Sequence, residues 1–174
     1  TEGSVVNITE YLDGYQYIKV ENRYNLQFFP HAEGYVNTIG GNNYVFNYTD
    51  HLGNIRLSYG VNRSTGVLTV LEENNYYPFG LKHNPYNTIT PAQEYKVKYQ
   101  GQERQDELGL NWDSFKWRNY DYAIGRFMSI DPLAEKYSYQ SPYNFAENKV
   151  VDHIELEGLE GLHHTFVDKA GNKS

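Results

Sequence analysis

The chain has 174 residues, which is enough for one domain with a buried core or for two lobes. Its formal net charge of −7 argues against general binding to nucleic acid or to an anionic membrane. It contains no cysteine, so the sequence offers no disulfide framework and no thiolate metal site. No apolar run approaches the roughly 20 residues of a membrane-spanning helix, and we expect no membrane insertion.

The first residue is Thr1 and the single methionine is Met128. We therefore expect a processed or truncated piece of a longer chain, with any export signal lying upstream. Tyrosine dominates the composition, with 18 residues. Aromatic side chains favour β structure. The other interpretation is an aromatic surface that binds carbohydrate or peptide.

Glycines separate aromatic segments at fairly even intervals along the chain. Spacing of this size is typical of repeat architectures, here of strand–turn–strand units. The glycines that mark these intervals are Gly14, Gly34, Gly53, Gly80, Gly101 and Gly125.

The clearest unit runs from Tyr44 to Tyr59. Alternation in 44–48 and 55–59 predicts two strands, each with one apolar face. Gly53 and Asn54 are expected to supply the positive φ angles of the reversal between them. A second hairpin is expected around the turn Arg63–Gly66.

Later segments give weaker signals. Residues 82–93 hold two prolines and read as an exposed loop. Tyr95–Tyr99 alternates between an apolar and a basic face. The best helical candidate is Pro132–Lys136, one or two turns long, with Asp131 as its N-cap.

Several phrases, in order, carry a family resemblance. The Tyr-x-Asp-x-x-Gly-Asn pattern at 48–54 resembles the YD repeat of Rhs (rearrangement hotspot) shell proteins. The longer phrases resemble the version found in Bacteroidetes-type bacteria, with its Rhs repeat-associated core. These phrases are Asp50-His-Leu-Gly-Asn-Ile-Arg56, Tyr77-Pro-Phe-Gly-Leu81, Gln105-Asp-Glu-Leu-Gly-Leu-Asn-Trp112 and Asp131-Pro-Leu-Ala-Glu-Lys-Tyr137.

The resemblance implies a mainly β fold with little helix. YD-repeat hairpins would spiral into the wall of a hollow shell and end in an inward-curling core, or plug, segment. By this resemblance, residues 1–110 are repeat units and 111–159 are the core segment. Residues 160–174 are a tail or the start of a variable C-terminal effector.

The resemblance also implies a site. The two acids of an aspartic-protease-like pair fall on Asp131 and Glu155, and the family's arginine falls on Arg118. The cut would follow Leu159, at the bond to Glu160. The chain departs from the family pattern at the second acid, where Glu155-Leu156 replaces Asp-Pro.

Two carboxyl groups can hydrolyse a peptide when they share one proton, because like charges about 3 Å apart cannot both ionise. One then activates water while the other, protonated, polarises the carbonyl. Arg118 could hold a carboxylate or the substrate carbonyl through its fork of donors. The alternative is an internal Arg118–Asp131 ion pair, with Glu155 as a solvated residue.

The function implied is that of a secreted or surface shell protein that encloses and releases a C-terminal effector, often a toxin. Its expected partners are the rest of its own shell, the cargo, and bacterial secretion or outer-membrane machinery. No cofactor is implied. One alternative is a non-catalytic adhesion or export-associated module, and another is a carbohydrate-binding β protein.

Other side chains point to no further site. The adjacent His163 and His164 would face opposite sides of a strand, and no third metal ligand is suitably spaced. No serine or cysteine nucleophile accompanies Asp152-His153. Trp112 and Trp117 lie in the core segment, where packing is the expected role.

Overall fold

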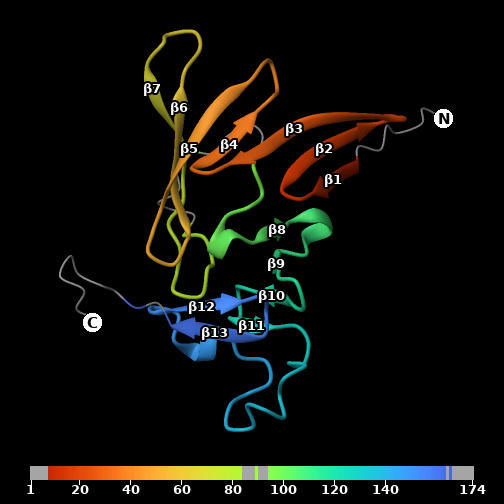
Figure 1. Cartoon of the computed structure of the whole chain (residues 1–174), viewed down its shortest axis with the longest axis vertical. Coiled ribbons are helices and arrows are strands. Elements are labelled where there is room, and N and C mark those ends of the chain that lie inside the picture. The colour runs from red at the N-terminus through yellow and green to blue at the C-terminus, as the bar shows by residue number, and fades with distance from the viewer. Residues whose placement is uncertain (1–7, 84–88, 90–93, 164, 166–174) are drawn as a thin grey trace. The chain divides into compact units, whose positions relative to one another are not determined.

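The computed structural model describes residues 8–83, 89, 94–163 and 165. Antiparallel strands with short connections dominate it, which confirms the prediction of a mainly β fold (Figure 1). Contacts divide the chain into two compact units. The first comprises Thr1–Tyr48, Leu57–Glu73 and Ile89–Pro91, and the second comprises Thr49–Arg56, Asn74–Thr88 and Ala92–Ser174.

Seven antiparallel strands pair in sequence order to form the larger sheet (Figure 1, red to yellow). They are β1 (Ile8–Leu12), β2 (Tyr15–Val20), β3 (Arg23–His31), β4 (Gly34–Asn37), β5 (Asn43–Thr49), β6 (Ile55–Val61) and β7 (Leu68–Glu73). The two-residue loop Asp13–Gly14 has positive φ at both positions, as a tight hairpin with the twist of its strands requires. Phe28, Tyr35, Val36 and Val45 form the buried apolar positions of this unit.

Both predicted hairpins are present, as β5–β6 and β6–β7. The face of β5 that carries Tyr44 and Tyr48 is exposed, whereas Val45 on the other face is buried. Gly53 has the expected positive φ of 79°. The expectation for Asn54 was wrong. Its φ is not positive, and its side chain instead bonds to Asp50 and to the backbone of Gln100.

Short strands and turns make up the second unit. A four-stranded sheet has the order β11 (Arg126–Phe127), β10 (Asn119–Asp121), β9 (Trp112–Ser114) and β8 (Glu103–Gln105). A separate hairpin pairs β12 (His153–Leu156) with β13 (Glu160–His163). Three single 3-10 turns, at Tyr99–Gly101, Glu107–Gly109 and Ala146–Asn148, each contain residues in left-handed conformation.

An aromatic cluster fills the second unit. The ring of Tyr120 stacks on that of Phe145 with centroids 3.9 Å apart, and Phe115 and Phe127 pack edge-on around them. Aromatic pairs in such arrangements contribute roughly 0.5–1.5 kcal/mol beyond the area they bury. The hydroxyl of Tyr120 donates to the carbonyl of Phe79, so its one polar group is satisfied.

Two further expectations for this unit were wrong. Pro132–Lys136 forms a run of turns and no helix, although the Asp131 carboxylate does accept the N–H of Leu133 at 2.7 Å, as an N-cap would. Tyr95–Tyr99 forms only an isolated bridge, from Val97 to Glu103, and although Tyr95 and Tyr99 of its apolar side are buried, Lys98 of its basic side is buried too, at 1% exposure.

The expected divisions at residues 110 and 159 remain predictions. In the structure, the pairing of β8 with β9 spans the first position and that of β12 with β13 spans the second. The expected loop 82–93 and tail 160–174 lie largely outside the described residues. None of the helical turns in the described part of the chain is long and apolar enough to cross a membrane.

Candidate functional site

Arg118 is the centre of the candidate site and lies in the second unit, just before β10. Its side chain is 1% exposed, and its guanidinium donates in three directions. Nε bonds to the carbonyl of Gly158 at 2.5 Å, Nη1 to that of Pro142 at 3.1 Å, and Nη2 to Asp131 Oδ2 at 3.0 Å. The guanidinium also lies 3.8 Å from the ring centroid of Phe127. Such a buried charge is tolerated because every side of it has a partner.

Asp131 is buried at the start of the turns that follow β11. Its two carboxyl oxygens have different partners, Oδ2 binding Arg118 and Oδ1 the N–H of Leu133. The backbone N–H of Asp131 donates to Pro142 O, which is also an acceptor for Arg118. The acid and the arginine are therefore held by one another and by a shared carbonyl.

Glu155 lies in β12 and is 4% exposed, so the expectation of a solvated side chain was wrong. Its Oε2 accepts the N–H of Ala146 at 2.6 Å. Its Oε1 lies 3.9 Å from Arg118 Nη2 and has no hydrogen-bond partner. Burial raises the pKa of Glu155 to about 7, against the opposing effects of the Ala146 N–H and the Arg118 charge. The carboxyl is thus protonated in mildly acidic solution.

The bond expected to be cut follows the turn that joins β12 to β13. Glu157 and Gly158 have φ angles of 56° and 85°, and the N–H of Leu159 donates to the carbonyl of Leu156. A Cβ on Gly158 would lie 3.0 Å from Phe115 Cβ, so the positive φ and the close approach to Phe115 both favour glycine here. The carbonyl that Arg118 Nε binds is that of Gly158, one residue before the Leu159–Glu160 bond.

The structure brings together all three residues expected from the sequence, Arg118, Asp131 and Glu155. One guanidinium nitrogen reaches both carboxyls, at 3.0 and 3.9 Å. An ion-paired carboxylate beside a carboxyl that keeps its proton is the combination that acid–base hydrolysis of a peptide needs. Their catalytic roles, and the cut after Leu159, stay predictions.

Sequence reasoning missed the residues that hold Glu155 in place. The side-chain carbonyl of Gln100 accepts the backbone N–H of Glu155 at 2.9 Å. Ala146 binds its carboxyl from a turn in which residues 146–148 all have positive φ. Non-glycine residues with positive φ are uncommon and often mark functional sites. The sequence gives a sign of this conformation only at Asn148, since asparagine enters it more readily than alanine or glutamate.

A buried carboxyl outside this site was also missed. Asp113, in β9, is 2% exposed, and its Oδ2 has no hydrogen-bond partner. Burial raises the pKa of Asp113 to about 7, opposed by the charges of Arg104 and Lys82 and assisted by that of Asp106. It lies in a strand too short for an alternating pattern to reveal which side chains point inward.

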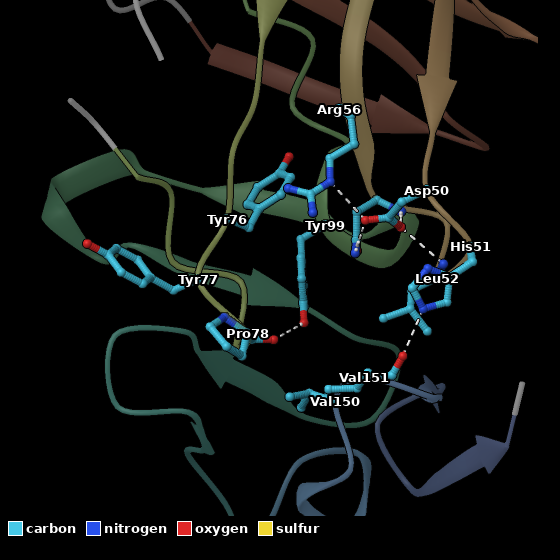
Figure 2. Close-up of a pocket in the computed structure, with 11 residues that line it drawn as sticks. Asp50, His51, Leu52, Arg56, Tyr76, Tyr77, Pro78, Tyr99, Val150 and Val151 are labelled. Atoms are coloured by element: carbon cyan, nitrogen blue, oxygen red, sulfur yellow. Dashed lines mark hydrogen bonds and ion pairs between the residues drawn. The ribbon is translucent and has the colours of Figure 1, made fainter. Parts of the chain in front are cut away.

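A cavity of about 240 Å³ opens elsewhere in the second unit (Figure 2). Arg56 forms part of its wall, donating to Asp50 at 2.9 Å and lying over the ring of Tyr76. The Tyr99 hydroxyl donates to the carbonyl of Pro78, as Figure 2 shows, so the polar atoms of this wall are largely paired internally. Leu52, Val150 and Val151 form an apolar side of the cavity.

The histidines and tryptophans singled out in the sequence have other partners. His153 and His163 face each other across β12 and β13, and both contact Asp152. Among the described residues no group of three potential ligands could hold a metal ion. Trp112 is half-buried and donates to Gln105, whereas Trp117 is 56% exposed, so the expectation that it packs was wrong.

Comparison with known proteins gives structural matches only. No protein-family model matches the chain, and no curated protein does. The crystal structure of TcdB2–TccC3 with Cdc42 matches with a TM-score of 0.53 and 21% identity over 88% of this chain. TcdB2–TccC3 without its hypervariable C-terminal region matches over the same share, with a TM-score of 0.51 and 21% identity.

A third match is the Tc holotoxin pore of Photorhabdus luminescens with a substituted TccC3, with a TM-score of 0.61 and 20% identity over 93% of this chain. The chain spans only 6% to 8% of the length of the chains it matches in these three structures. At such low identity the likeness concerns the fold. It shows that this chain shares the fold of a segment of these toxin complexes.

Proposed function

We propose that this chain is the C-terminal shell-and-core segment of a secreted Rhs/YD-repeat protein, and that it cuts its own backbone after Leu159. The shell would enclose a C-terminal effector, and the cut would detach that effector from the shell. The observation that carries the catalytic part is the single guanidinium placed between two buried carboxyls and bonded to the carbonyl of Gly158.

The structural likeness supports the shell part of the proposal. Two of the matched structures contain TccC3 joined with TcdB2, and one of them is defined by the loss of a hypervariable C-terminal region. A variable region that follows a constant shell is the arrangement expected of an effector cargo. The Bacteroidetes-type core, the export route and the surface or secreted location rest on the sequence phrases alone.

In the proposed reaction, Asp131 takes a proton from a water molecule whose oxygen attacks the carbonyl carbon of Leu159. Glu155 donates its proton to the carbonyl oxygen, so a tetrahedral diol forms. The C–N bond then breaks as Asp131 passes its proton to the nitrogen of Glu160 and Glu155 takes back a proton from a hydroxyl of the diol. The products are a Leu159 carboxyl group and a Glu160 amine, and together they contain the atoms of the original peptide plus one water.

The test follows the mass of the full chain with time, beside a Glu155→Gln variant and a Glu155→Asp variant. The proposal expects fragments that end at Leu159 and begin at Glu160 in the unaltered chain. It expects none from Glu155→Gln, since an amide cannot donate a carboxyl proton. Cutting that occurs only in Glu155→Asp would show that the longer side chain has disabled the site.

A second candidate is a non-catalytic adhesion or export-associated module, and the bonding of Asp131 favours it. Both carboxyl oxygens of Asp131 already accept hydrogen bonds, from Arg118 and Leu133, as a purely structural acid would. For this function the Leu159–Glu160 bond stays intact in every variant, after any length of incubation.

A further inference from the structure

Glu155 is linked by hydrogen bonds to a turn far from it in sequence, the segment 50–54, which we name the Asp50 turn. Asp50 Oδ1 accepts the backbone N–H groups of Leu52 and Asn54, both at 3.0 Å. Asp50 Oδ2 accepts the side-chain amide of Asn54 at 3.0 Å and the guanidinium of Arg56 at 2.9 Å. One carboxylate therefore fixes the position of the Asn54 side chain.

The Asn54 side chain, held in this way, binds the backbone of Gln100. Its side-chain oxygen accepts the backbone N–H of Gln100 at 2.9 Å, and Asn54 is only 4% exposed. Gln100 has the left-handed angles φ 46° and ψ 31°, in which a non-glycine residue needs support from its surroundings. The carbonyl of Lys98 accepts the N–H of Ile55 at 3.2 Å and adds a second link between the same two segments.

Gln100 completes the connection to the candidate site. In the described structure β12 pairs with β13 alone, and the N–H of Glu155 bonds to Gln100 Oε1 at 2.9 Å. Gln100 is 8% exposed, so no bulk water is at hand to replace this acceptor. The path Asp50–Asn54–Gln100–Glu155 is thus an unbroken chain of buried or half-buried hydrogen bonds.

We infer that Gln100 is a positioning residue for Glu155, and that the carboxyl pair is complete only when the Asp50 turn has folded. This inference rests on the proposed self-cleavage and concerns what regulates the activity of the same site. The cut would wait until the turn of the repeat unit has formed, which prevents release of a cargo before its enclosure is built. Misplacement of a reacting group by about 1 Å costs roughly a hundredfold in rate, so one hydrogen bond is enough for such control.

Two variants remove the acceptor in different ways. Gln100→Asn shortens the side chain by one methylene and keeps an amide, and asparagine tolerates positive φ. Gln100→Met keeps the length and loses the acceptor, so it serves where the first variant folds poorly. Gln105→Asn is the matched control, because Gln105 also accepts one N–H, from Trp112, but does not touch Glu155.

Each full chain is synthesised in a cell-free reaction, and its mass is followed from the end of synthesis. We expect Gln100→Asn and Gln100→Met to form the fragment ending at Leu159 roughly ten- to a hundredfold more slowly than the parent. Gln105→Asn should cut at the parental rate. Parental rates in both Gln100 variants would overturn the inference.

A second readout separates this inference from the self-cleavage on which it rests. In an Asp131→Asn background, where no cutting is expected, the Glu155 carboxyl is titrated by carbon NMR with and without Gln100→Asn. Loss of the Gln100 bond should loosen β12, admit water and lower the midpoint by about half a pH unit or more. A parent that never cuts would refute the self-cleavage, and an unchanged midpoint would refute the positioning role.

The part played by the Asp50 turn is tested by a double-mutant cycle. Asn54→Ala and Gln100→Asn interrupt the same chain of bonds, so the double variant should cut no more slowly than the slower single variant. If the two reductions in cutting rate multiply in the double variant, the Asp50 turn acts independently of Gln100, and its part in the inference would be overturned.

Discussion

Strands of four to nine residues build the sheet of β1–β7, whereas strands of two to four residues build the sheets of the second unit. Regular ladders hold the first unit together. The second is held by side chains that bond to backbone groups of turns, as Arg118 does with Gly158 and Pro142. The first unit is therefore organised by its backbone ladders, and the second by side-chain contacts around the candidate site.

The two units also differ in what they bury. The apolar positions of the first unit are Phe28, Tyr35, Val36 and Val45, all at 3% exposure or less. Among the described residues, the first unit buries one carboxyl, that of Glu72, whereas the second buries several ionisable groups beside its aromatic cluster, among them Arg118, Asp113 and Glu155. Buried charge is costly unless paired, and its presence is more typical of functional sites than of scaffolds.

The largest expected effect comes from removing the buried guanidinium. Arg118→Met leaves Asp131 without its partner in an apolar setting, and we expect a loss of about 3–5 kcal/mol in the free energy of unfolding. Hydrogen exchange should rise in β9–β13. The control is Arg63→Met, because Arg63 also bonds two carbonyls, of Gly40 and Asn42, but does so at the surface of the first unit. Equal losses of unfolding free energy in Arg118→Met and Arg63→Met would contradict the difference between the two units.

The next effect concerns pH. Burial raises the pKa of Glu155 and of Asp113 to about 7, so between pH 4.5 and 7 the folded chain holds protons that the unfolded chain has released. Their contribution to stability is complete below the unfolded values and is lost as pH rises through 7. Each group accounts for on the order of 3–4 kcal/mol, since one pKa unit is worth about 1.4 kcal/mol.

Urea unfolding at a series of pH values measures this loss. In Asp113→Asn the free energy of unfolding should fall less steeply with pH than in the parent. The asparagine carries no charge to desolvate, so the variant should be the more stable chain at pH 8. A parental slope in Asp113→Asn would show that Asp113 is not protonated in the folded chain.

The smallest effect tests the turn where the repeat motif lies. Gly53 has φ 79° and nothing within 4 Å of an added Cβ, so Gly53→Ala meets backbone strain without a clash. We expect a loss of about 1–2 kcal/mol. Gly53→Asn should lose less, because asparagine enters this conformation more readily. The shift in the urea midpoint measures the loss of stability in each variant. Equal losses in Gly53→Ala and Gly53→Asn would argue that side-chain contacts, and not the positive φ, cause the loss.

Local patterns predicted the fold well where strands are long. Alternation over 44–48 and 55–59 located β5 and β6, although in β5 the face with Tyr44 and Tyr48 is exposed and Val45 on the other face is buried. The same reasoning failed for Tyr95–Tyr99, where Lys98 is buried and the segment ends in a left-handed turn at Gln100. Tertiary contacts decide the backbone there.

The candidate site was predicted in part. Arg118, Asp131 and Glu155 were chosen because of a family resemblance, and the structure places them together. Gln100 and Ala146 could not be found from the sequence, because their contacts depend on positive φ angles at non-glycine residues. Asp113 was missed because β9 has only three residues.

The central claim, that the Arg118–Asp131–Glu155 arrangement cuts the chain, is tested most directly by intact-mass measurement of the full chain and an Asp131→Asn variant. Asp121→Asn is the control, since Asp121 also caps a turn, but its carboxylate accepts the N–H groups of Ala123 and Ile124 and does not bind Arg118. The account predicts a fragment ending at Leu159 from the parent and from Asp121→Asn, and only the intact mass from Asp131→Asn. The same intact mass from all three chains would contradict it.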